Sequence, residues 1–137
     1  MYTGRMTWSA QSVEALTSAA DHTDIFAPGI RVKIHKVGFL VSVLTSGAAT
    51  VKFDITNNSG TRGDGDAGAV TVPDATAVGQ AIIDTTSTIF PVVINAGQFV
   101  TPQVTSAAST AGSGFYFIEY EVLTDTNAND ANVAESA

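Results

Sequence analysis

Apolar and polar residues alternate over several short stretches of the chain, which is the period of a strand whose two faces differ. In residues 31–35, Val32 and Ile34 share one face and the polar side chains take the other. Beyond residue 36 the apolar residues move to the odd positions of 37–43. A bulge produces such a change of phase inside a continuing strand, and Gly38 tolerates the bend. We predict one long bent strand, or two strands that share a corner.

A second alternating stretch follows after a short turn. Residues 45–48 carry the turn signal, and in residues 50–56 the apolar side chains of Val51, Phe53 and Ile55 fall on one face. Two alternating strands joined by so short a connection predict a β-hairpin.

The middle of the chain is less regular. Asn57 to Gly68 is dense in Gly, Asn and Asp, which predicts a mobile surface loop. The shorter segments that follow are predicted as a strand at 70–72, a helical turn or a loop at 75–81, a strand at 82–89 and, beyond Pro91, an extended segment at 92–94.

Two strands are predicted towards the end, separated by a small-residue loop at 106–114. The first, residues 98–105, contains Pro102, so it is expected at a sheet edge or with a bulge. The second, residues 115–123, is the most aromatic. One of its faces is core, with Tyr116, Ile118, Tyr120 and Val122. The other begins with Phe115 and Phe117 and ends with Glu119 and Glu121, so we expect a loop, an arm or another subunit to cover its apolar part.

These elements predict an all-β fold, a two-sheet antiparallel sandwich of jelly-roll type, with an immunoglobulin-like Greek key as second choice. The composition agrees, because 15 Val, 9 Ile and 18 Thr outnumber the straight-chain helix formers. Residues 1–24 are predicted as an N-terminal arm or first strand, 25–124 as the sandwich and 125–137 as a disordered acidic tail. Within the first segment, 12–17 fits a strand better than a short helix capped by Ser12, and the preceding residues are expected as an arm.

Charge and cysteine content exclude several kinds of partner. The net charge is −7, and residues 63–137 contain nine acids but no Lys or Arg, so nucleic acid is not expected as a partner. The longest near-apolar run, residues 37–44, is too short to span a membrane, so none is expected there either. The chain has no cysteine, which removes disulfides, thiolate metal sites and cysteine nucleophiles.

No group of residues predicts catalysis, so we expect no enzyme, no catalytic residue and no cofactor. His22 lies in the acidic segment 21–24, which suits a polar turn better than a metal site, and His35 is expected on the surface. Ser113 lacks the pattern of a nucleophile elbow. Glu119 and Glu121 point the same way on one strand, whereas glycosidase carboxylates normally come from different strands of a cleft.

Two features could still bind something. Arg62 and Asp64 belong to an Arg-Gly-Asp tripeptide, which is the motif of integrin ligands but recurs easily by chance in polar loops. Asp64 and Asp66 lack the spacing of a calcium loop, so no metal is expected. Trp8 is the only tryptophan and could serve as a sugar platform or as an arm residue that docks on a neighbour.

Three stretches, residues 25–34, 95–100 and 114–120, resemble small β-sandwich proteins of tailed bacteriophages, nearest to the capsid decoration or cement proteins. The resemblance covers residues 25–123. It implies a structural virion protein on the outer surface of the capsid that forms a homotrimer and binds the major capsid protein. The alternative is a carbohydrate- or receptor-binding module of a phage tail or fibre. Trp8, Phe115, Phe117, Arg62 and Asp64 are the candidate interaction residues.

Overall fold

The computed structural model describes residues 4–57, 62–85, 89–108 and 110–123, with only the backbone for 62–64. This part of the chain contains strands and no helix, so no helical segment in it could span a membrane. The strands are β1 (Arg5–Ser9), β2 (Glu14–Ala15), β3 (Ala20–Asp21), β4 (Val32–Ser46), β5 (Ala49–Thr56), β6 (Arg62–Val72), β7 (Ala81–Ile83), β8 (Val92–Ile94), β9 (Phe99–Ser106) and β10 (Ala111–Val122).

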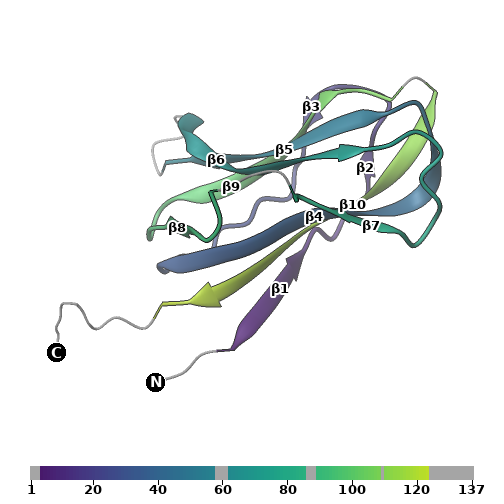
Figure 1. Ribbon diagram of the computed structural model, residues 1–137. Helices are drawn as coiled ribbons and strands as arrows, with labels where there is room; N and C mark the ends of the chain where they lie inside the picture. Colours follow the sequence, from purple (N-terminus) through teal and green to yellow (C-terminus); the bar gives the residue numbers. More distant parts are fainter. Residues whose placement is uncertain (1–3, 58–61, 86–88, 109, 124–137) are drawn as a thin grey trace, which may run out of the picture.

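The strands form two antiparallel sheets that pack against each other (Figure 1). The larger sheet has the order β1-β10-β4-β7, with β2 added to β10 and β8 added to β4. The smaller sheet has the order β3-β9-β5-β6. The predicted all-β sandwich is therefore confirmed, whereas the jelly-roll type stays a prediction.

Strand β4 is the long bent strand that the change of phase predicts. Its register against β10 shifts by one residue between the pairs Lys36↔Glu119 and Ile34↔Tyr120, which leaves His35 as the extra residue of a bulge. Val32, Ile34 and Val37 are all fully buried, so the bulge keeps the apolar side chains on the core face on both sides of the bend.

The predicted hairpin of β4 and β5 is wrong, because the two strands belong to different sheets. Gly47, with φ of 90°, lies in the short turn that carries the chain from one sheet to the other. The buried side chains of Val41 on β4 and Val51 on β5 belong to one core between the sheets. Alternation shows which face of a strand is apolar, and it does not distinguish strands that lie side by side from strands that face each other.

Strand β6 corrects the prediction of a loop at Asn57 to Gly68. Residues 62–68 continue the strand that reaches Val72, while residues 58–61 lie outside the described part. Two register shifts against β5 and positive φ angles at Gly65 and Gly68 accommodate the glycines as bulges at the sheet edge. Gly68 also lies so close to Val37 and Phe90 that a side chain there would collide with both.

The N-terminal residues also differ from the prediction. Arg5–Ser9, expected as part of an arm, form β1 along β10, whereas the predicted strand at 12–17 is reduced to the two residues of β2. Trp8 explains the difference, because its ring packs against the core and lies 5.7 Å from the ring of Phe26. The edge of β10 thus gains both backbone pairing and apolar burial from β1.

Three later elements differ in extent. The strand predicted at 82–89 is limited to β7, and residues 86–88 lie outside the described part, as does the predicted tail at 125–137. Of the segment at 75–81, residues 75–80 form a loop and not a helical turn, and Ala81 begins β7. The last strand begins at Ala111, within the loop predicted at 106–114.

The strand that contains Pro102 is not an edge strand, because β9 pairs with both β3 and β5. It has the irregularity that was predicted as the alternative, since its register against β5 shifts between the pairs Val51↔Val104 and Thr50↔Ser106. The carbonyl of Pro102 accepts a hydrogen bond from the amide of His22, on the side of the short strand β3. In an extended strand the nitrogen of a residue points to the same side as its carbonyl. The missing donor therefore faces the two-residue strand and leaves the pairing of β9 with β5 intact.

A glycine on β10 tests how closely the core is packed. A side chain on Gly114 would collide with the Leu40 carbonyl oxygen and the Phe39 ring. We expect Gly114→Ala to lower the free energy of unfolding by about 1–3 kcal/mol or more, since backbone is one of the obstacles. Urea denaturation measures this, with Ser113→Ala, which loses one hydrogen bond to Ser42 but meets no obstacle, as the control in the same strand. Equal stability of the two variants would contradict the close approach.

Candidate functional site

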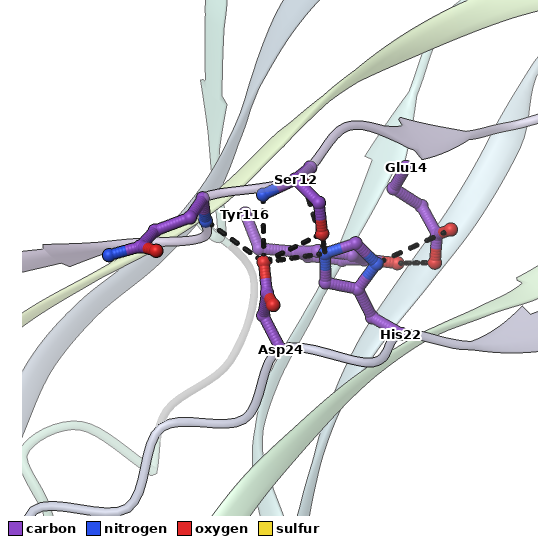
Figure 2. A network of polar contacts seen from close by, with 6 residues as sticks. Ser12, Glu14, His22, Asp24 and Tyr116 are labelled. Carbon is purple, nitrogen blue, oxygen red and sulfur yellow. Dashed lines mark hydrogen bonds and ion pairs between the residues drawn. The ribbon is translucent and has the colours of Figure 1, made fainter.

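A group of polar side chains joins the N-terminal segment to the core strand β10. Figure 2 shows Ser12, Glu14, His22, Asp24 and Tyr116 converging from three parts of the chain. Two of these parts are the segments around the short strands β2 and β3, and the third is β10. We call these five residues the His22 network.

Tyr116 forms the inner end of the network. Its side chain is fully buried, and its ring makes edge contacts with Phe39 of β4 and Phe53 of β5, so it contacts both sheets. Its hydroxyl donates a hydrogen bond of 3.2 Å to Glu14 Oε2. Burial, and then the neighbouring Glu14 carboxylate, raises the pKa of Tyr116 far above its ordinary value of 10.0, so the phenol stays protonated.

His22 occupies the centre, with its side chain only 4% exposed. Its Nδ1 lies 3.5 Å from Glu14 Oε1, and its Nε2 lies 3.1 Å from the Ser12 carbonyl oxygen and 3.5 Å from Asp24 Oδ2. Oxygen acceptors thus face both ring nitrogens, so whichever nitrogen carries a proton has an acceptor next to it. The ring also lies 5.4 Å from that of Tyr116, so the histidine adds apolar contact to the polar bonds.

Asp24 closes the network at the surface. Its Oδ2 accepts hydrogen bonds of 2.9 Å from the amide of Gln11, 2.8 Å from the amide of Ser12 and 2.8 Å from the Ser12 hydroxyl. These bonds, the Ser12 amide first, hold the pKa of Asp24 below its ordinary value of 3.8. The sequence predicted a local polar turn at residues 21–24. Instead, Asp24 binds the backbone of a segment more than ten residues away.

The order Ser12, His22, Glu14 has the outline of a nucleophile, a base and an orienting acid. The Ser12 hydroxyl donates to Asp24 at 2.8 Å and lies 3.4 Å from His22 Nε2, which is closer to the Ser12 carbonyl oxygen. A base that activates a hydroxyl must receive its proton, and here the proton is directed at Asp24. These contacts therefore join the segments around β2 and β3 to each other, and they lack the arrangement of an activated nucleophile.

Metal coordination is the other chemistry that neighbouring His, Asp and Glu side chains can support. In the described part of the chain no group of three or more His, Asp or Glu side chains is placed to hold a metal ion. Asp66, considered with Asp64 for calcium, lies 3.4 Å from Lys52 Nζ and forms an ion pair with it.

The candidate residues of the sequence lie in three separate places. Trp8 lies in β1 beside the His22 network, with its ring turned towards the core. Phe115 and Phe117 lie on the outer face of the larger sheet. Arg62 and Asp64 belong to strand β6 of the smaller sheet, and only their backbone is described.

His35, Glu119 and Glu121 also lie on the outer face of the larger sheet. His35, predicted as a surface residue, is largely buried and lies 2.9 Å from Glu121 Oε1. The hydrogen bond from His35 lowers the pKa of Glu121 below its ordinary value of 4.5. Glu119 pairs with Arg5 at 3.4 Å. Both carboxylates therefore have partners on a sheet face.

The sequence reasoning missed Ser12 and Glu14, the two network residues on the N-terminal segment. Glu14 is a buried acid beside a buried tyrosine hydroxyl, and such pairs form because each group needs a partner. Tyr116 on a core face was a signal that some buried acceptor exists. Nothing in the sequence showed which acceptor it was.

No family model matches the chain, and no curated protein matches it. The functional argument therefore starts from the residues of the chain.

Removing the Tyr116 hydroxyl tests the inner end of the network. We expect Tyr116→Phe to lower the free energy of unfolding by about 1–3 kcal/mol, because Glu14 loses a buried donor. Urea denaturation measures the change. Tyr120→Phe, on the same face of β10, is the matched control and should change stability by less than about 0.5 kcal/mol. A larger loss in the control would contradict the assignment.

The outer end of the network is tested by acid. Because the pKa of Asp24 is lower in the folded state, its stabilising effect is present above the unfolded value and is lost as the pH falls through the folded value. We expect wild type to melt higher than Asp24→Asn near neutral pH, and the difference to shrink in acid. Thermal melts from about pH 6 to about pH 2 measure it. A difference that stays constant with pH would refute the effect of the charge.

Proposed function

We propose that this protein is a structural virion protein that decorates the outer surface of a bacteriophage capsid. In this proposal it acts as a homotrimer, binds major capsid subunits and reinforces the shell. The resemblance of residues 25–123 to decoration proteins suggests this role. The observation that supports it best is an exposed apolar surface on the outer face of the larger sheet.

Two rows of residues across three strands make up this surface, which we call the outer patch. Residues directly opposite each other in an antiparallel pair point to the same face. One row joins Phe115 of β10 to Leu40 of β4 and Ala81 of β7, and the next joins Phe117 to Gly38 and Ile83. Leu40 is 40% exposed and Ile83 is 38% exposed. Apolar side chains on adjacent strands thus form one continuous area.

Gly38 shapes the outer patch. A side chain at this position would collide with the ring of Phe117, so the ring lies over the glycine backbone. The aromatic side chain is therefore held in place before any partner arrives, which reduces the entropy lost on binding.

Charged residues border the outer patch along the same strands. Beyond Phe117 the next residues on this face are Glu119, opposite Lys36, and Glu121, opposite Lys33. Apolar centres with polar borders are the usual composition of protein interfaces. The surface is built on hydrogen-bonded strands, which suits a rigid contact with a shell.

Capsid binding tests the proposal directly. We expect Leu40→Lys to weaken cosedimentation with purified capsids by about tenfold or more, because it places a charge at the centre of an apolar contact. Ile30→Lys is the control, since Ile30 is exposed but lies outside the sheets. Wild-type protein that fails to sediment with capsids, or equal binding of both variants, would count against the outer patch as the capsid contact.

The trimer has its own test. Light scattering coupled to size-exclusion chromatography should give three times the 14.1 kDa mass of the chain. A monomer that persists at high concentration would contradict the trimer, whether or not capsids are bound.

A further inference from the structure

A shallow pocket of about 300 Å³ lies beside the His22 network, between β1 and the segment that follows β3. It is lined by Trp8, Ser9, Gln11, Thr23, Asp24 and Ile25. We propose that this pocket binds a neutral sugar ring. The inference goes beyond the proposed capsid role and does not depend on it, because the outer patch and the pocket share no residue.

The lining groups suit a ligand that both donates and accepts hydrogen bonds. Trp8 has an indole N–H and Gln11 a side-chain amide, and within the described residues neither of these groups has a hydrogen-bond partner in the protein. Five of the six lining residues carry a polar side chain, counting Ser9, Thr23 and Asp24. Sugar hydroxyls can act as donor and acceptor at once, so they match this mixture.

Asp24 is a fixed acceptor in this lining. Its three hydrogen bonds from residues 11 and 12 all fall on Oδ2, and His22 lies on the same oxygen. The carboxylate is thus held in one orientation, with Oδ1 outside these bonds. A preorganised acceptor costs less conformational entropy on binding than a free surface side chain.

Trp8 supplies the apolar wall. Its ring is partly exposed and contacts the ring of Phe26 in a tilted arrangement, at a centroid distance of 5.7 Å. Sugar rings present C–H groups on their faces and hydroxyls at their edges. An aromatic ring next to hydrogen-bonding groups complements both parts.

The charge of the pocket selects among sugars. Asp24 brings a negative charge to the lining, and no Lys or Arg is among the lining residues. The net charge of −7 adds to the repulsion of anions. Neutral hexoses and N-acetylhexosamines should therefore bind, whereas uronic acids should be excluded. The volume lies at the lower end of the roughly 300–1,000 Å³ typical of small-molecule sites, which fits one ring better than a long chain.

Trp8 is the only tryptophan, so tryptophan fluorescence reports on the surroundings of this one lining residue. We expect titration of the wild-type protein with glucose, galactose and N-acetylglucosamine to give a saturable change for at least one of them, with an affinity of about millimolar. Glucuronic acid should give no change. A flat response to all the neutral sugars would overturn the proposal.

Calorimetry with the best sugar then tests the residues. Gln11→Ala should weaken binding about three- to tenfold, because one hydrogen bond to the ligand is lost. Trp8→Phe keeps an aromatic ring against Phe26 but removes the indole N–H and part of the ring area, so it should also weaken binding while the protein stays folded. Gln80→Ala, an exposed amide outside the pocket, is the matched control.

Each outcome is decisive for the pocket. Weaker binding in Gln11→Ala and Trp8→Phe with unchanged binding in Gln80→Ala supports the assignment. Unchanged binding in all three variants, or equal loss in all three, overturns it. Capsid cosedimentation of Gln11→Ala should equal that of wild type, so failure of the sugar site and failure of the capsid proposal remain distinguishable.

Discussion

The requirement that a buried hydroxyl has a hydrogen-bond partner organises much of this molecule. Tyr116 brings its ring between the two sheets, where it contacts aromatic residues of β4 and β5, and its hydroxyl comes with it. Glu14 meets that need, but a buried carboxylate needs partners in turn, and His22 lies next to it. Asp24 and Ser12 continue the series to the surface. One aromatic side chain in the core thereby adds a second attachment of the N-terminal segment, besides the pairing of β1 with β10.

Successive side chains of strand β10 point alternately into the core and to the outer face of the larger sheet. The side chains that face inward, Tyr116 and Ile118, are fully buried in the core. Those that face outward, Phe115 and Phe117, are partly exposed and lie next to Leu40 and Gly38 of the neighbouring strand. The same period of two therefore supplies both the stability of the sandwich and the area proposed to contact a capsid.

The sequence predicted the fold class well and the connections poorly. Alternation identified β4, β5 and β10, and the change of phase near Gly38 located the bulge, because burial on one face leaves a local signal. The assignment of β4 and β5 to different sheets left no such signal, since inward residues look alike in both arrangements. The strand of Gly and Asp at residues 62–68 was missed because its bulges hide the alternation.

The sequence predicted the candidate site less well than it predicted the fold. Trp8 was singled out, yet its place beside Asp24 depends on β1 joining the sheet, which short-range pattern did not predict. His22 was assigned to a local turn because its near neighbours are polar. Its actual partners include Glu14 and Tyr116. The hydrogen bond between Glu14 and Tyr116 joins residues 102 positions apart, and such a contact is set by the folded chain.

The exposed edge of the smaller sheet is the strand β6, which combines glycines in the left-handed region, two register shifts and an aspartate paired with Lys52. A flat edge with free amides and carbonyls would invite another chain to add itself as an extra strand. The irregular backbone and the acidic side chain make β6 a poor template for such growth. Crowded copies of this protein would consequently meet through their faces and remain protected against fibril formation along this edge.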